Sequence, residues 1–184
     1  MAQPIPVLII GAGNIGQAIG KVISKNASIG YWDKDPAKIK GERDLDKAIQ
    51  KARIIFLCTP SWTIRGIARQ IVRAVGSRSQ DSDSDKKNQR PETKDPGPKL
   101  VISLSKGIED NSAKLPCEIL KEELGGKADS GVLAGPMIAE ELNKGEPTVA
   151  VMGLDHARWH KPLTALFDGT SLSLTFSDDL KGLS

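Results

Sequence analysis

The sequence predicts an α/β protein with a doubly wound, mainly parallel sheet flanked by helices. Short apolar runs alternate along the chain with amphipathic stretches, which is the pattern of right-handed βαβ units. The first apolar run, Val7–Ile10, stops at three glycines spaced G-x-G-x-x-G, and a helical pattern follows at once. The chain has 184 residues, enough for one domain over residues 1–184 with a full core.

The predicted elements follow from these patterns in chain order. Apolar runs predict strands near residues 6–10, 28–32, 53–58, 100–104, 131–134, 148–152 and 172–176. Helical periodicity predicts helices near residues 15–25, 45–52, 64–72, 112–124 and 155–167, with a short helix after Gly135-Pro136. We expect Ser61 or Thr63 to cap the third of these helices and Pro116 to lie in the first turn of the fourth.

Residues 77–99 break the alternation, because they contain no hydrophobic residue. A segment of this composition buries too little apolar surface to offset the entropy lost on ordering. We therefore predict a disordered polar insertion on the surface, between a helix and the next strand. Its charges nearly cancel, and we interpret it as a spacer rather than as a docking or modification loop.

The composition excludes several functional classes. A net charge of +3, with 39% hydrophobic and 27% charged residues, is ordinary for a globular protein. No run of basic residues is interleaved with aromatic ones, so no nucleic-acid partner is expected. Cys58 and Cys117 lack metal-ligand spacing, and the apolar run over residues 5–10 is too short to span a membrane. We expect no metal, no membrane span and a reducing, cytoplasmic setting.

The glycine turn indicates a dinucleotide site at the carboxyl end of the first strand. Gly11 allows the tight turn, Gly13 lets a pyrophosphate approach the backbone, and Gly16 lets the helix pack close to the strand. The free N–H groups and the positive dipole end of that helix then face the phosphates. The alternative is a glycine-rich turn without a ligand, but a preceding strand and a following helix favour the dinucleotide.

An acidic residue stands where a dinucleotide site needs one. The second predicted strand ends at Asp33, whose carboxylate would accept hydrogen bonds from the adenosine ribose hydroxyls and would repel a 2′-phosphate. Asp33 therefore favours NAD over NADP. Lys34 and Lys38 weaken that preference, because a cation there would neutralise a 2′-phosphate; their alternative interpretation is a solvated, basic helix start.

Three more segments follow predicted strands and so lie at the sheet edge where cofactors bind in doubly wound folds. Thr59-Pro60 would border the nicotinamide half of a cofactor, although an ordinary βα turn has the same form. Lys106 would attract an anionic substrate such as a phosphate ester, or polarise a carbonyl oxygen, although a lone lysine after a strand is usually solvated. Gly135 and Met137 would again lie at the ligand edge.

Together these segments resemble the N-terminal, cofactor-binding domain of NAD(P)-dependent glycerol-3-phosphate dehydrogenases. The matching segments, in the order of the family, are Gly11–Gly16, Thr59–Ser61, Ser105–Glu109, Gly135-Pro136, Ala139–Glu141 and Gly145–Thr148. They cover most of the chain outside the polar insertion. The resemblance implies a Rossmann-like fold and a reaction in which dihydroxyacetone phosphate, a phosphorylated triose, and sn-glycerol 3-phosphate are interconverted by hydride transfer at the nicotinamide.

The resemblance also implies roles for individual residues. Asn14 and Ile15 would contact the cofactor pyrophosphate through their backbone, and Lys106 would contact both the substrate and the cofactor edge. The substrate-binding residues implied are Lys106, Gly135 and Met137. The predicted cofactor-binding residues are Gly11, Gly13, Asn14, Ile15, Gly16, Asp33, Pro60, Lys106 and Ala139.

Two features depart from the pattern of the family. Met137 stands where bacterial members usually carry Ser or Thr, and a thioether cannot donate a hydrogen bond to a substrate. We also expect the helical second domain, which supplies the acid/base lysine in the family, to be absent, so that no catalytic residue is assigned and the chain alone is inactive or weakly active. Lys181 is interpreted as a surface residue, and His156 and His160 as a solvated face of one helix rather than as metal ligands.

Two alternatives to the cofactor domain of such an enzyme stay open. One is a stand-alone dinucleotide-binding module without catalysis. The other is a related dehydrogenase with an imidoacid or hydroxyacid substrate, against which Lys106 and Gly135-Pro136 count. The sequence does not fix the oligomeric state, for which a homodimer is one option.

Overall fold

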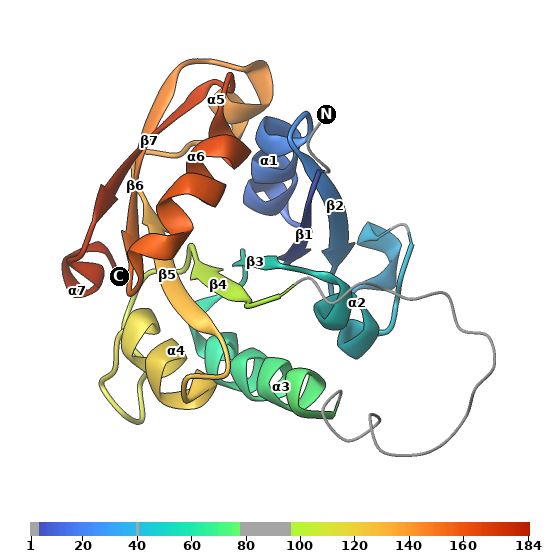
Figure 1. The fold of residues 1–184 in the computed structure, drawn as a ribbon, viewed down its shortest axis with the longest axis vertical. Helices are drawn as coiled ribbons and strands as arrows, with labels where there is room; N and C mark the ends of the chain where they lie inside the picture. Colours follow the sequence, from blue (N-terminus) through green and yellow to red (C-terminus); the bar gives the residue numbers. More distant parts are fainter. Residues whose placement is uncertain (1–3, 40, 78–96) are drawn as a thin grey trace.

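A computed structural model describes residues 4–39, 41–77 and 97–184. These residues form one seven-stranded sheet with the strand order β2-β1-β3-β4-β5-β6-β7 and with helices on both faces (Figure 1). Strand β6 runs antiparallel to β5, whereas the other neighbouring strands are parallel. The predicted fold class, a doubly wound and mainly parallel sheet, is confirmed.

The elements have the following bounds. The strands are β1 Ile5–Ile10, β2 Ala27–Trp32, β3 Ile54–Leu57, β4 Leu100–Ser103, β5 Asp129–Ala134, β6 Thr148–Leu154 and β7 Leu172–Ser177. The α-helices are α1 Asn14–Ile23, α2 Leu45–Lys51, α3 Ile64–Ser77, α4 Pro116–Leu124, α5 Ala139–Lys144, α6 His160–Phe167 and α7 Leu180–Leu183. The short 3₁₀-helices are η1 Pro36–Lys38, η2 Ser61–Thr63 and η3 Ala157–Trp159. None of the helices in the described part of the chain is long and apolar enough to cross a membrane.

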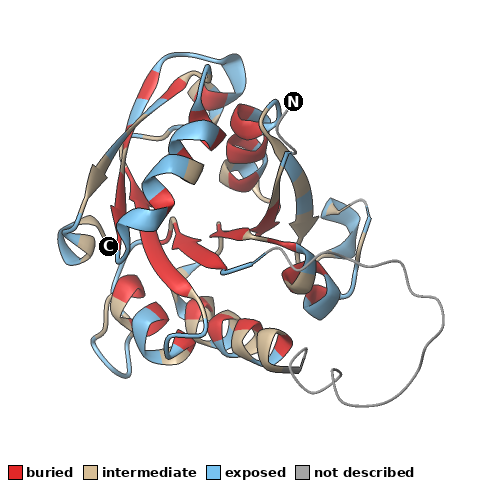
Figure 2. Ribbon diagram, in the orientation of Figure 1, coloured by how far each residue is buried: buried red, intermediate tan, exposed pale blue. Residues whose placement is uncertain are grey.

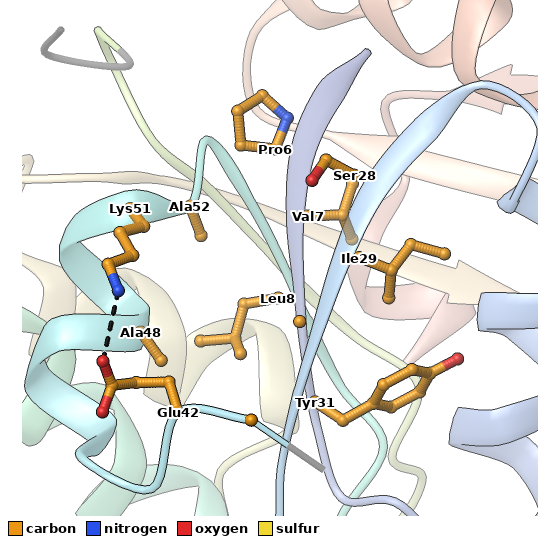
Figure 3. A pocket seen from close by; sticks show the side chains of 12 residues that line it. Pro6, Val7, Leu8, Ser28, Ile29, Tyr31, Glu42, Ala48, Lys51 and Ala52 are labelled. Carbon is orange, nitrogen blue, oxygen red and sulfur yellow. Dashed lines mark hydrogen bonds and ion pairs between the residues drawn. The ribbon is translucent and has the colours of Figure 1, made fainter. Parts of the chain in front are cut away.

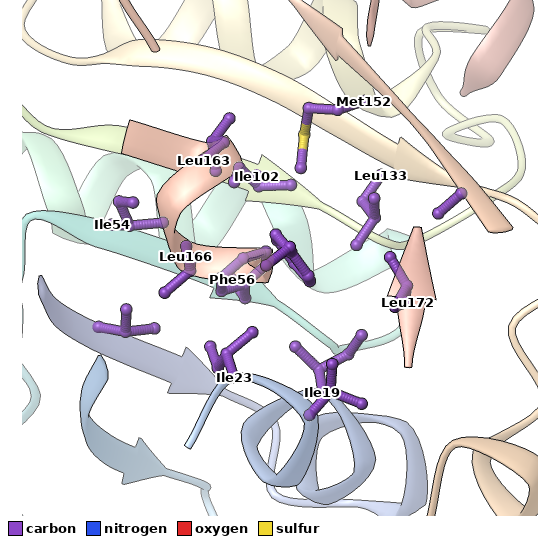
Figure 4. Packing of buried hydrophobic residues seen from close by; sticks show 14 of the residues in the cluster. Ile19, Ile23, Ile54, Phe56, Ile102, Leu133, Met152, Leu163, Leu166 and Leu172 are labelled. Carbon is purple, nitrogen blue, oxygen red and sulfur yellow. The ribbon is translucent and has the colours of Figure 1, made fainter. Parts of the chain in front are cut away.

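The central strands β3 and β4 are buried on both faces, which explains why they are nearly continuous apolar runs, whereas the edge strands β2 and β7 are partly exposed (Figure 2). On one face, α1 and α6 pack against a row of side chains that includes Ile9, Phe56 and Ile102 from neighbouring strands in register (Figure 4). On the other face, α2, α3 and α4 cover a second cluster that includes Leu8 and Ile55. Successive side chains of a strand point to opposite faces, so each central strand contributes to both clusters.

Two helices differ from the sequence prediction at their start. Helix α4 begins at Pro116 rather than at residue 112, because a proline disfavours helical backbone at the residue before it, and Leu115 is extended. The helix predicted over residues 155–167 is divided, since His156 is extended, η3 follows, and α6 begins only at His160. The prediction that His156 and His160 share one helix face is therefore wrong.

The polar insertion predicted over residues 77–99 lies almost wholly outside the described residues. At its two described ends, Ser77 is the last residue of α3, and Lys99 is buried immediately before β4 rather than at the surface. The Lys99 ammonium donates hydrogen bonds to the backbone carbonyls of Gln50, at 3.2 Å, and of Ala52. These carbonyls replace water around the charge, which a sequence pattern of polar residues does not reveal.

The contact between α1 and the preceding turn gives a testable prediction. A Cβ on Gly16 would lie 2.0 Å from the carbonyl oxygen of Gly11, so Gly16→Ala is expected to lower the free energy of unfolding. Overpacking of this kind usually costs about 1–3 kcal/mol. Gly66 is an exposed position in α3 where an added Cβ meets no atom within 4 Å. Gly66→Ala should therefore raise the same free energy, by roughly 0.5–1 kcal/mol. Urea unfolding measures both changes, and a wild-type value for Gly16→Ala would contradict this packing.

Candidate functional site

The glycine turn joins β1 to α1 at the carboxyl end of β1. Gly11 has a φ of +100°, and a Cβ there would lie 2.5 Å from the carbonyl oxygen of Cys58. Gly16 packs on the same turn. At Gly13, by contrast, an added Cβ meets no protein atom within 4 Å. The fold itself therefore requires Gly11 and Gly16, whereas Gly13 borders open space.

Helix α1 begins at Asn14 with its positive end toward that space. Gly13 is its N-cap, no side chain caps it, and no acidic residue lies in its first turn. Asn14 is exposed and Ile15 is half-buried against the core. N–H groups without a side-chain cap at a helix start form a suitable site for an anion, as predicted for a pyrophosphate.

Asp33 follows β2 and faces the glycine turn. Its Oδ2 accepts a hydrogen bond from the backbone N–H of Ala12 at 2.8 Å, and its Oδ1 accepts one from the N–H of Asp35 at 2.9 Å. The sequence did not predict this structural role, in which the carboxylate ties the end of β2 to the turn after β1. A carboxylate offers about four lone-pair sites, so each oxygen retains capacity for a ribose hydroxyl.

A cleft of about 460 Å³ opens between the glycine turn, the end of β2 and the β3–α3 turn. Its lining residues are Gly11, Gly13, Trp32, Asp33, Lys34, Lys38, Cys58, Thr59, Pro60, Trp62, Thr63 and Ile67. Four predicted cofactor residues, namely Gly11, Gly13, Asp33 and Pro60, thus meet around one cleft. The sequence reasoning missed Trp62, which is 77% exposed and offers an aromatic face for stacking.

Lys106 lies on the turn after β4, beside the β3–α3 turn. The Ser105 hydroxyl donates a hydrogen bond to the carbonyl oxygen of Thr59. A Cβ on Gly107 would lie 3.6 Å from the Ser61 hydroxyl. Lys106 itself is exposed between these contacts. Its turn is therefore packed against the turn that borders the cleft, although Lys106 is not among the residues that line it.

The remaining predicted residues follow β5, the next strand along the sheet edge. The N–H of Met137 donates to the carbonyl oxygen of Gly135 at 2.8 Å, which closes a tight turn. Met137 is half-buried and packs against the core, and Ala139 is the first residue of α5. The structure therefore brings Gly135, Met137 and Ala139 to the same edge of the sheet as Lys106, but not into the cleft.

A network of charged residues connects the two turns to α4. Arg65, in the first turn of α3, places its Nη2 2.7 Å from a carboxylate oxygen of Glu109 and also pairs with Glu122 and Glu123. The side chains of Arg65 and Glu109 are only 19% and 16% exposed. The hydrogen bonds from Arg65 hold the pKa of Glu109 at about 2. Sequence reasoning missed this network, since its members lie far apart in the chain.

The histidines do not form a metal site with each other. His156 Nε2 lies 3.4 Å from a carboxylate oxygen of Asp129, whereas the His160 ring stacks on Phe176 at 4.3 Å between centroids. Within residues 4–39, 41–77 and 97–184, no three histidine, cysteine or acidic side chains gather as metal ligands would. Lys181 is exposed and pairs with Glu118 at 2.7 Å, in agreement with its interpretation as a surface residue.

A second hollow, of about 310 Å³, lies between β1, β2 and α2 (Figure 3). The ion pair between Lys51 and Glu42, at 3.2 Å, borders it. Its lining includes none of the residues predicted from the sequence to bind cofactor or substrate. The cleft at Gly13 therefore coincides with the sequence motif, whereas this second hollow does not.

Comparisons with known proteins agree with this geometry. The profile of a family described as the NAD-dependent glycerol-3-phosphate dehydrogenase N-terminus matches residues 34–160. A glycerol-3-phosphate dehydrogenase [NAD(P)+] of Pseudomonas putida is 26% identical over 206 residues, which cover 100% of this chain and 54% of that protein. A similar enzyme of Methylobacillus flagellatus is 29% identical over 97% of this chain. This chain thus spans about half the length of the curated relatives that it matches.

The solved structures show the same fold. The crystal structure of a glycerol-3-phosphate dehydrogenase from Coxiella burnetii superposes with a TM-score of 0.74 at 20% identity, over 96% of this chain and 55% of the other. The glycine turn and Asp33 lie outside the range that the family profile matches. For those residues the comparison rests on the sequence alignment with the Pseudomonas putida enzyme, which covers all of this chain, and on the superposed fold.

The depressed pKa of Glu109 gives a prediction about pH. Its value of about 2 lies below the ordinary 4.5, so the stability that its charged form contributes is complete above pH 4.5 and is lost as the pH falls toward 2. Glu109→Gln removes this contribution. The variant should be less stable than wild type at pH 7, and the difference should shrink as the pH falls through this window. Urea unfolding between pH 2.5 and 7 measures it, and a constant difference would contradict the prediction.

Proposed function

The chain belongs to the NAD-dependent glycerol-3-phosphate dehydrogenase N-terminus family, and from that premise we propose that it binds NAD(H) for an oxidoreductase of sn-glycerol 3-phosphate and dihydroxyacetone phosphate. One observation carries the proposal. Gly13 caps α1 and borders open space, whereas a Cβ on Gly11 or Gly16 would collide with backbone atoms. Packing alone does not require a glycine at position 13, because an added Cβ would meet no protein atom within 4 Å.

The residues present fit a dinucleotide. The open N-terminus of α1 would hold the pyrophosphate through the N–H groups of Asn14 and Ile15, with Gly13 allowing close approach. Asp33 would accept hydrogen bonds from the adenosine ribose, and Pro60 would border the nicotinamide half. The Trp62 ring would supply an apolar wall for an aromatic ring of the cofactor.

The substrate half of the proposal centres on Lys106. The bound nicotinamide supplies or accepts the hydride at the carbon that alternates between ketone and alcohol. The Lys106 ammonium would attract the phosphorylated triose and stabilise negative charge as it develops on the carbonyl oxygen. Gly135 and Met137 would border the substrate at the end of β5. We assign no acid/base residue within this chain and propose that it turns over little or no substrate alone.

Further proposals concern the cellular setting and the partners of the protein. We propose a cytoplasmic protein of glycerophospholipid metabolism, for which the unpaired thiols of Cys58 and Cys117 are suited to a reducing compartment. We propose a phosphorylated triose as the small-molecule partner. Homodimerisation stays a prediction.

A second candidate function is a dinucleotide-binding module without catalysis. Met137 favours it, because its thioether cannot donate a hydrogen bond to a substrate in the place predicted for one. Both candidates require cofactor binding, so they differ only in what happens to the substrate.

The experiment for the proposal compares two glycine variants. Gly13→Val is expected to abolish NADH binding in a fluorescence titration, because its side chain occupies the space proposed for the pyrophosphate, while the far-UV spectrum and melting temperature stay near wild type. Gly30→Val is the matched control, since an added Cβ on this exposed residue of β2 makes only ordinary contacts, at 3.8 Å or more. Wild-type affinity in Gly13→Val, or no binding by the wild-type chain, would overturn the proposal.

The wild-type chain and the Gly30→Val control, loaded with NADH, are then assayed for dihydroxyacetone phosphate reduction. The account expects little or no turnover by this chain alone. Robust turnover would contradict the assignment of the acid/base group to a region outside these residues.

Cofactor preference tests the role of Asp33. The wild-type chain should bind NADH more tightly than NADPH, because the carboxylate repels a 2′-phosphate. Asp33→Asn should narrow that ratio by roughly tenfold, equivalent to about 1.4 kcal/mol. Lys34→Ala should widen it, since Lys34 lies at the same cleft. Because both affinities are measured on the same preparation of a variant, their ratio does not depend on how much of the protein is folded. An unchanged NADH/NADPH affinity ratio in Asp33→Asn would show that the carboxylate does not face the ribose.

A further inference from the structure

The Arg65 network joins the wall of the cofactor cleft to the turn that carries Lys106. We propose that Arg65 is a positioning residue, whose ion pair with Glu109 fixes this turn and so holds Lys106 at the substrate half of the site. The inference rests on the proposed function, because it takes Lys106 to be a ligand-binding residue. It assigns to Arg65 no contact with cofactor or substrate.

The anchor downstream of Lys106 is a fork of hydrogen bonds. Arg65 Nε lies 2.9 Å and 3.1 Å from the two carboxylate oxygens of Glu109, and Nη2 lies 2.7 Å from one of them. This is the bidentate arrangement that a guanidinium makes and an ammonium cannot. Glu109 in turn accepts backbone N–H bonds from Ser112 and Ala113 through its carbonyl oxygen, so fixing Glu109 fixes the loop beyond it.

The anchor upstream of Lys106 is weaker. The Ser105 hydroxyl bonds the carbonyl of Thr59, and β4 ends at Ser103. Between the two anchors, Lys106, Gly107 and Ile108 are all exposed. Without the Arg65 fork, Glu109 would keep its backbone hydrogen bonds within the loop but would lose its attachment to α3. These exposed residues would then be held less firmly, and a glycine among them lets the backbone move freely.

Arg65 is itself held on both sides. It is the second residue of α3, which directly follows η2, and two residues of η2, Trp62 and Thr63, line the cleft. On its other side it pairs with Glu122 and Glu123 of α4. Without the guanidinium, the carboxylates of Glu109 and of these two residues would face one another with less neutralising charge. Their repulsion would move the Lys106 turn away from α4, which adds to the loss of the fork.

The alternative is that Arg65 only joins α3 to α4. Arg69 offers a matched control for that role, because it lies one helical turn further along α3 and pairs with Glu123 at 2.9 Å. Arg69 is 61% exposed and makes no hydrogen bond or ion pair with Glu109 among the described contacts. A residue that merely joins the two helices is thus available for comparison with one that also holds the turn.

The experiment first measures how firmly the Lys106 turn is held and then measures ligand affinity. Hydrogen exchange at the amides of Glu109, Ser112 and Ala113, whose N–H groups are hydrogen-bonded within the loop after Lys106, should accelerate by roughly tenfold in Arg65→Ala and stay at the wild-type rate in Arg69→Ala. Glu109→Gln, which tests the pair from its other side and preserves side-chain shape, should accelerate exchange in the same direction. Arg65→Lys keeps the charge without the fork, and its exchange rate should fall between wild type and Arg65→Ala.

Binding of the whole cofactor and of a fragment that lacks the nicotinamide separates positioning from general damage to the fold. ADP-ribose lacks the nicotinamide, so it should bind every variant with wild-type affinity, whereas NADH should bind Arg65→Ala several-fold more weakly. Wild-type exchange rates in both Arg65→Ala and Glu109→Gln would overturn the inference, and so would an equal effect of Arg69→Ala. If the wild-type chain binds neither ligand, the proposed function fails, while the exchange rates still decide whether Arg65 fixes the turn.

Discussion

The close contact between the start of α1 and the turn after β1 is the constraint on which the rest of the site depends. Gly16 lies so near the Gly11 carbonyl that no side chain fits between them. This contact sets the position of α1 against the sheet and aims its uncapped first turn across the strand ends. The proposed anion site thus follows from packing, which itself requires the glycines at positions 11 and 16.

Along the rest of the sheet edge, contacts within the fold likewise set the positions of residues proposed to bind a ligand. Asp33 holds the end of β2 to the glycine turn through the N–H of Ala12, so the residue proposed to bind ribose also builds the cleft around it. Ser105 holds the Lys106 turn to Thr59, which borders that cleft. Each turn is fixed by its neighbour, and the side chains proposed to face a ligand lie on turns whose other side chains are committed to the fold. At this edge, residues proposed to bind a ligand therefore also hold the fold together.

The fold was predictable because it depends on local patterns. Apolar runs such as Ile54–Leu57 are buried on both faces, and the spacing of the three glycines identifies the first strand and helix without further information. The starts of α4 and α6 were predicted wrongly, since Pro116 excludes helical backbone before it and since His156 is extended ahead of η3. Lys99 was misjudged because its burial depends on carbonyls contributed by Gln50 and Ala52, far away in the chain.

The candidate site was predictable in part, for the same reason. Residues of one motif, such as Gly11 and Gly13, meet around the cleft as expected, whereas Lys106 and Met137 reach the same sheet edge without lining it. The pair of Arg65 and Glu109 had no local signal, because its members are separated by 44 positions and are brought together only by the order of β3 and β4.

The central claim is that a dinucleotide binds with its pyrophosphate at the start of α1. Mapping of amide chemical shifts by NMR during titration with ADP-ribose tests it most directly, because it locates the ligand without relying on any substitution. The account predicts the largest shifts at Gly13, Asn14 and Ile15, with smaller ones at Asp33. Shifts centred instead on the hollow beside Glu42 and Lys51, or none at the start of α1 in a chain that binds the ligand, would contradict it.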